Sequence, residues 1–333
     1  MAEEKKVKFE LEPIASTSTA PILRPKPEHT PEHHGSSSSH HQARSTSSFS
    51  LETLNAVVLR NVKVQYGSRI PILRSFKKTN VVLENCSLTV PKKNLFALLG
   101  ANSSGKTTLL STIVGLKRVS KGEVWVLGSH SYNIAGSKIG YMPQELALMG
   151  ELTIIETMWF FGMLYKINEK AFASRLHKYF GTLKLPNLER PVKYLSGGQK
   201  RRLSFILAIL HGPKVVILDE PCVGVDPVVR KKMWDLLREY VDNSRTVITT
   251  TQYIEEAKDA TEVAFLYKGR IIAQDSPANF KEKFGKDTMN EVFYQLSQDL
   301  DAGKTTLDQT DSHSKDDNEK LVYKKQQWSP GRV

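Results

Sequence analysis

Eight consecutive residues of this chain have the types and the spacing of a loop that holds a nucleoside triphosphate. They are Gly100, Ala101, Asn102, Ser103, Ser104, Gly105, Lys106 and Thr107, which match the pattern G-x-x-x-x-G-K-[ST]. The small residues allow backbone N–H groups to approach phosphate oxygens, and a helix beginning near Lys106 adds its positive N-terminal end. Lys106 is expected to bridge the β- and γ-phosphates, Thr107 to ligate Mg²⁺ and Thr108 to reach the α-phosphate.

An acidic pair follows an apolar run later in the chain, in the order Val215-Val216-Ile217-Leu218-Asp219-Glu220. The run predicts a buried strand, whose carboxyl end lies where α/β sheets bind ligands. Asp219 is therefore expected to meet the water shell of the metal. Glu220 points the other way and is expected to take the proton from an attacking water. Together with the phosphate loop, this pair predicts hydrolysis of MgATP.

A short polar turn, Leu195-Ser196-Gly197-Gly198-Gln199, precedes the acidic pair and leads into a predicted helix. The Ser196 hydroxyl, the N–H groups of Gly197 and Gly198, and the helix end beside Gln199 can meet a γ-phosphate presented by another subunit. In this order, the loop, the turn and the acidic pair resemble the nucleotide-binding domain of ATP-binding-cassette (ABC) proteins.

The resemblance implies an α/β fold: a P-loop NTPase cassette with a RecA-like core, an antiparallel β lobe and an inserted helical lobe. It also implies a head-to-tail dimer with a second ABC cassette, as a homodimer or a heterodimer. Three more residues take roles from matching positions. Tyr66 would stack on adenine, Gln144 would offer its amide oxygen to Mg²⁺, and Asp226 would cross the dimer interface.

Two positions depart from the family pattern. Ser103 stands where the family loop usually has glycine, and if the backbone needs a positive φ there, serine costs roughly 1–2 kcal/mol. Gln252 stands where the family usually has a histidine that contacts the γ-phosphate. An amide donates a hydrogen bond but never becomes a cation, so this change predicts slower hydrolysis more than weaker binding.

Hydrophobic periodicity and changes in composition divide the chain into a predicted cassette between two tails. Residues 1–54 are rich in Ser, Thr, Pro and His and are predicted to be a disordered N-terminal tail. Residues 55–297 are the predicted ATP-binding domain, with its helical lobe at about 145–212. Residues 298–333 are predicted to be a polar linker or tail, with the transmembrane domain absent.

Alternation and apolar runs predict the individual elements of the cassette. The predicted strands are 62–66, 81–90, 95–99, 122–127, 138–142, 214–218, 246–251, 263–267 and 270–274. The predicted helices are 106–114, 228–241, 253–260, 280–284 and 289–296, with further helical pattern across 145–194.

Charge and cysteine content limit the partners of the chain. Residues 55–297 hold 35 basic and 21 acidic residues, a balance that suits a solvated surface near a membrane. No aromatic-interleaved basic stripe is present, so we expect no nucleic acid partner. The apolar stretches are shorter than a transmembrane helix needs. The two cysteines, Cys86 and Cys222, suit a reducing compartment.

Within the family, the segments around Gln144, Asp226 and Tyr253 look most like the G subfamily and its arthropod relative, the H subfamily. Those proteins are half-transporters that dimerise and export lipids or other hydrophobic compounds. The resemblance implies a transmembrane domain that docks near residues 145–165, and a place on the cytoplasmic face of a membrane, with the plasma membrane expected. A soluble ABC ATPase and a regulatory cassette that does not itself transport remain alternatives.

Overall fold

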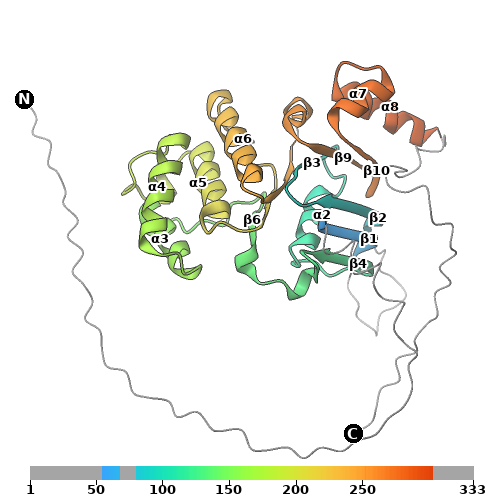
Figure 1. The fold of residues 1–333 in the computed structure, drawn as a ribbon. Helices are drawn as coiled ribbons and strands as arrows, with labels where there is room; N and C mark the ends of the chain where they lie inside the picture. Colours follow the sequence, from blue (N-terminus) through green and yellow to red (C-terminus); the bar gives the residue numbers. More distant parts are fainter. Residues whose placement is uncertain (1–54, 68–79, 252, 303–333) are drawn as a thin grey trace, which may run out of the picture. The chain divides into compact units, whose positions relative to one another are not determined.

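The computed structural model describes residues 55–67, 80–251 and 253–302 (Figure 1). The predicted tail at 1–54, most of the predicted linker at 298–333, and Gln252 lie outside the described residues. All the elements below belong to one compact unit.

A six-stranded sheet forms the core, in the order β10-β9-β3-β8-β7-β6. Its strands are β3 (Leu95–Leu99), β6 (Ile139–Met142), β7 (Val215–Leu218), β8 (Thr246–Thr250), β9 (Glu262–Tyr267) and β10 (Arg270–Asp275). All neighbours pair in parallel except β9 and β10, which form an antiparallel hairpin. The hairpin turns at Lys268 and Gly269, both with positive φ, where the sequence predicts the turn.

A second, antiparallel sheet has the order β2-β1-β4-β5. Its strands are β1 (Asn55–Tyr66), β2 (Asn80–Pro91), β4 (Lys121–Val126) and β5 (Ser129–His130). The sequence analysis missed β5, because two residues are too few to show an alternating pattern. Hydrogen bonds join the two sheets where Glu84 N–H donates to the Gly269 carbonyl at 3.0 Å and Gln274 Nε2 donates to the Thr89 carbonyl at 2.6 Å.

Seven α-helices accompany the sheets in the described part of the chain. They are α2 (Lys106–Ile113), α3 (Ile154–Leu164), α4 (Glu169–Leu183), α5 (Gly197–Leu210), α6 (Pro227–Asp242), α7 (Pro277–Phe284) and α8 (Met289–Asp301). The predicted helix at 253–260 is instead the 3₁₀ helix η5 (Ile254–Asp259). Helix α8 runs five residues beyond its predicted end.

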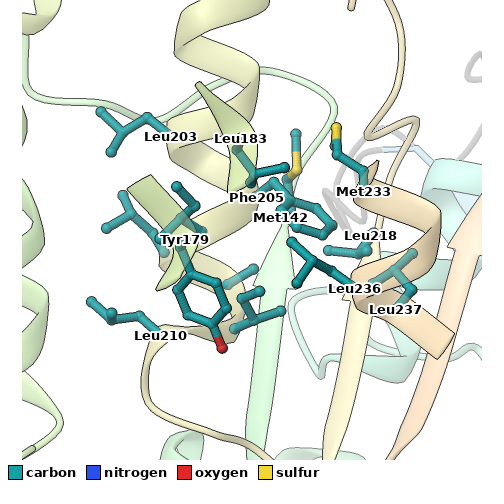
Figure 2. Close-up of a cluster of buried hydrophobic side chains, with 14 of the residues drawn as sticks. Met142, Tyr179, Leu183, Leu203, Phe205, Leu210, Leu218, Met233, Leu236 and Leu237 are labelled. Carbon is teal, nitrogen blue, oxygen red and sulfur yellow. The ribbon is translucent and has the colours of Figure 1, made fainter. Parts of the chain in front are cut away.

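The central strands bury both of their faces, which is why they read as continuous apolar runs. On β7, Val216 and Leu218 join a core built from α4, α5 and α6, while Val215 and Ile217 join a second core with α2 and the antiparallel sheet. Figure 2 shows the first of these cores, where Phe205 of α5 lies beside Met142 of β6. The described region is thus an α/β core with an antiparallel β lobe and a set of added helices, as the sequence predicts.

None of the helices in the described ranges combines the length and the apolar character needed to cross a bilayer.

The contact between β6 and α5 leaves no space for a side chain at Gly140. A Cβ built there would lie 1.9 Å from the Ala208 carbonyl oxygen and 2.8 Å from Pro213. Because the carbonyl is backbone, Gly140→Ala should destabilise the fold by about 2 kcal/mol. Urea unfolding measures this, with Gly136→Ala as the control, since nothing lies within 4 Å of a Cβ at Gly136. Equal midpoints for the two variants would contradict this account of the β6–α5 contact.

Candidate nucleotide-binding site

The phosphate loop, the acidic pair and Gln144, all singled out in the sequence, converge at one edge of the six-stranded sheet. Strands β3, β8, β7 and β6 are parallel neighbours, so their carboxyl ends share that edge. The phosphate loop follows β3, Asp219 follows β7, Thr250 ends β8, and Gln144 lies two residues past β6. In sheets of this kind, this edge is where ligands bind.

The phosphate loop requires glycine at two positions, Gly100 and Gly105. A Cβ at Gly100 would lie 2.3 Å from the Leu266 carbonyl oxygen, and Gly105 caps α2 with φ +109°. Ser103 adopts φ +64°, the conformation in which a serine is strained. Ala101, Asn102 and Ser103 are exposed, whereas Ser104 is buried. The expectation that this loop position uses a positive φ is therefore met.

Lys106 is buried at the base of the loop, with 5% of its surface exposed. Its Nζ donates to the carbonyls of Gly100 and Ala101 at 2.9 and 3.0 Å. Burial lowers the pKa of Lys106, and the nearby carboxylates of Glu220 and Asp219 oppose that shift. The protein has therefore already removed the Lys106 ammonium from water, so phosphate oxygens that bind beside it would form charge-assisted hydrogen bonds.

A chain of side-chain hydrogen bonds links the phosphate loop to the acidic pair. Thr107 Oγ1 donates to Gln144 Oε1 at 3.2 Å, and Gln144 Nε2 donates to Glu220 Oε2 at 3.3 Å. Gln144 is thus held between the residue expected to bind the metal and the residue expected to act as base. The structure brings these three predicted residues together.

Asp219 is fully buried at the end of β7. Its Oδ1 accepts a hydrogen bond from Thr250 Oγ1 at 2.7 Å. Burial raises the pKa of Asp219, while the hydroxyls of Thr107 and Thr250 and the charge of Lys106 act in the opposite direction. Its second oxygen, Oδ2, accepts no hydrogen bond that meets normal geometry in the described part of the chain.

These oxygens fit a magnesium ion. The Thr107 hydroxyl, the Gln144 amide oxygen and the unpartnered Asp219 Oδ2 are oxygen ligands of the kind that Mg²⁺ prefers. Magnesium keeps several waters and uses few protein ligands beside substrate phosphates, so a carboxylate acting through a bound water suits this set.

Tyr66 lies beside the start of α2. Its hydroxyl is 3.2 Å from Thr108 Oγ1, and Lys117 Nζ lies 4.9 Å from the centre of its ring. Tyr66 as a whole is 39% exposed. Lys117 covers one face of the ring by a cation–π contact, so a base would stack on the other face or displace this lysine.

The polar turn Leu195-Ser196-Gly197-Gly198-Gln199, called the signature turn from here on, leads into the N-terminus of α5. Ser196 caps the helix by accepting from Gln199 N–H at 3.3 Å, and the Gln199 side chain accepts from Ser196 N–H at 2.9 Å. Ser196 and Gly197 are exposed. A Cβ on Gly198 would lie 2.6 Å from the Gly224 carbonyl oxygen, so the turn packs against the loop before Asp226.

Asp226 is exposed and caps α6, accepting from Val229 N–H at 3.0 Å. A local capping role was not part of the sequence prediction for this residue.

Comparison with known proteins decides the family. A family model described as ABC transporter matches residues 83–223, from within β2 to just past the acidic pair. The chain carries the ATP-binding domain of the ABC transporter family. ABC transporter G family member 20 of Dictyostelium discoideum is 38% identical over 245 residues, which are 72% of this chain and 32% of that protein. The chain therefore spans about a third of the length of that relative.

Solved structures agree with the fold. The ATP-binding subunit of an ABC transporter superposes with a TM-score of 0.65 at 22% identity, covering 73% of this chain and 99% of that one. The dimeric cassette MJ0796, in a post-hydrolysis state bound to ADP and Pi, superposes with a TM-score of 0.59 at 22% identity, covering 66% and 98%. The predicted fold class, an α/β ABC cassette, is confirmed.

The ABC cassette also contains a contact that the sequence analysis missed. Arg201 of α5 donates to the Glu220 carbonyl at 2.8 Å and to the Gln144 carbonyl at 3.3 Å. It lies in the basic run Lys200-Arg201-Arg202, where the sequence does not tell which side chain points inward. Through Arg201, the helix that begins with the signature turn holds the backbone on both sides of the site.

The left-handed conformation of Ser103 yields a prediction for the ABC cassette. Because the strain comes from its Cβ, Ser103→Gly should raise the free energy of unfolding by about 1 kcal/mol. Ser103→Ala keeps the Cβ and serves as the control, with stability close to that of the wild type. Urea unfolding without nucleotide measures both. A glycine variant no more stable than the alanine variant would show that this position carries no strain.

Proposed function

We propose that this ABC cassette binds and hydrolyses MgATP as the motor domain of a membrane exporter of lipid or another hydrophobic compound. The observation that carries the proposal is the hydrogen-bonded set Thr107, Gln144 and Glu220 at the sheet edge, beside the buried Asp219 and Lys106. This set combines phosphate binding, metal binding and a base in one place.

The proposed steps follow from the positions of the side chains. Lys106 and the loop N–H groups bind the β- and γ-phosphates, and Thr108 and Tyr66 lie on the side where the α-phosphate and adenine would extend. Glu220 accepts the proton of the attacking water. Thr107, Gln144 and Asp219 would hold a magnesium ion, which would supply charge neutralisation at the phosphates when bound.

A second cassette would complete the site. The turn from Ser196 to Gln199, exposed at Ser196 and Gly197, presents a helix N-terminus, which favours an anionic phosphate from another subunit. The solved MJ0796 cassette, which shares this fold, is dimeric and bound to ADP and Pi. We propose the same head-to-tail pairing here, with Asp226 at the interface, in a homodimer or a heterodimer.

An apolar face on α3 supports a transmembrane partner. Trp159, Phe160, Met163 and Leu164 are 53%, 43%, 50% and 61% exposed and lie within two turns of one helix. Exposed apolar patches of this kind mark interaction sites. Phe161, by contrast, packs against the core. We propose that a transmembrane domain docks near residues 145–165.

The domain assignment and the location complete the proposal. We propose that the cassette begins at residue 55 and extends to the end of α8 at Asp301, four residues past the predicted boundary at 297, with a helical lobe at about 145–212. Because relatives such as the Dictyostelium discoideum G family member are named as transporters, we place the cassette on the cytoplasmic face of a membrane, with the plasma membrane as the expected one.

Removal of the buried ammonium tests the function. Lys106→Ala should weaken MgATP binding by about 1.5–3 kcal/mol, because a charge-assisted contact to phosphate is lost. It should also abolish phosphate release. Calorimetry and a phosphate-release assay measure both effects, and Lys170→Ala, an exposed lysine at the start of α4, is the matched control. Equal ATP affinity in the wild type and Lys106→Ala would refute the assignment.

The glutamine at position 252 predicts a slow enzyme that still binds ATP well. Gln252→His should raise turnover about tenfold with little change in ATP affinity, because a group able to become cationic is restored beside the γ-phosphate. Steady-state turnover at saturating MgATP measures the effect, and calorimetry checks the affinity. An equal or lower rate in the histidine variant would show that the glutamine does not limit hydrolysis.

A further inference from the structure

Thr250, the last residue of β8, lies fully buried between the two acidic residues of the site. Its hydroxyl donates to Asp219 Oδ1 at 2.7 Å and accepts from the backbone N–H of Glu220 at 2.8 Å. One side chain therefore holds a carboxylate oxygen of one acidic residue and the backbone of the next. No sequence motif considered above includes this residue.

Thr250 bridges Asp219 and Glu220 because a hydroxyl can donate one hydrogen bond and accept another at the same time. A hydroxyl has one proton and two lone pairs, so the proton donated to Asp219 leaves a lone pair for the Glu220 N–H. Both bonds are buried, and a donor to a carboxylate forms one of the stronger kinds of hydrogen bond. Valine has the same shape as threonine but makes neither bond.

The Asp219 carboxylate and the Glu220 backbone, which Thr250 contacts, are each in an unusual environment or conformation. Asp219 uses Oδ1 for Thr250, which leaves the buried Oδ2 without a hydrogen-bond partner, in a carboxyl group whose pKa the Thr107 hydroxyl and the Lys106 charge help to lower against burial. Glu220 has φ +50°, a conformation that non-glycine residues adopt only when their surroundings impose it. The Thr250 hydroxyl and the Arg201 guanidinium hold the N–H and the carbonyl of Glu220 respectively.

We propose that Thr250 is a positioning residue for the reaction of this cassette, an inference that rests on the proposed hydrolysis of MgATP. Thr250 fixes the Asp219 carboxylate so that Oδ2 faces the magnesium water shell. It also fixes the backbone of Glu220 so that the base keeps its direction. Thr250 touches neither ATP nor the attacking water and acts through these two residues.

Three variants test the proposal. Thr250→Val removes both hydrogen bonds and keeps the shape, and Thr250→Ser keeps the hydroxyl. Thr249→Val makes the same change one residue earlier, also at a fully buried position, where the hydroxyl has only a long 3.4 Å bond to the Thr250 carbonyl. Each variant is compared with the wild type for turnover, for ATP affinity with Mg²⁺ and with EDTA by calorimetry, and for its unfolding midpoint.

The expected result separates positioning from folding. Thr250→Val should lower turnover about tenfold and reduce the gain in ATP affinity that Mg²⁺ provides, while its affinity in EDTA stays at the wild-type value. Thr250→Ser should restore both properties, and Thr249→Val should match the wild type in both.

Other outcomes overturn the proposal. Wild-type turnover and a wild-type magnesium effect in Thr250→Val would show that the bridge positions nothing of consequence. Equal losses in Thr250→Val and Thr249→Val, with a parallel fall in EDTA affinity and unfolding midpoint, would show a packing role only. If the wild type itself releases no phosphate, the proposed function fails, and the magnesium effect on ATP affinity still decides the role of Thr250.

Discussion

The burial of the Asp219 carboxylate is the constraint on which the site depends. A charged group removed from water is costly unless nearby groups compensate it, and Asp219 has no exposed surface. The Thr250 hydroxyl, the Lys106 charge and the Thr107 hydroxyl all oppose the rise in its pKa that burial produces. These groups come from two segments, the end of β8 and the end of the phosphate loop, so the carboxylate ties β7 to both.

The same edge of the sheet concentrates backbone strain. Ser103 and Glu220 both adopt a positive φ, at +64° and +50°. Left-handed residues other than glycine persist when the surrounding structure imposes them, and they cluster at ligand sites. Here the surroundings are the ends of two central strands whose faces are fully buried, so the loops that follow them have few alternative paths.

Helix α5 connects the two halves of the proposed reaction. Its N-terminus carries the exposed signature turn, its interior packs on β6 against Gly140, and Arg201 contacts the carbonyls of Glu220 and Gln144. These contacts hold the N-terminus of α5 and the backbone of Glu220 and Gln144 in one packed unit. The geometry thereby joins the surface proposed for a second cassette to the catalytic edge.

The sequence by itself determined the strands of the six-stranded sheet, the phosphate loop and the acidic pair, because apolar runs, alternation and motif spacing are local properties. The run 95–99 coincides with β3, and the positive φ at Ser103 follows from the position of that serine in the loop. The tertiary structure alone decided the Thr250 bridge to Asp219 and the Arg201 contact to Glu220. These pairs are separated by 31 and 19 residues, and only the order of strands in the sheet and the packing of α5 bring them together.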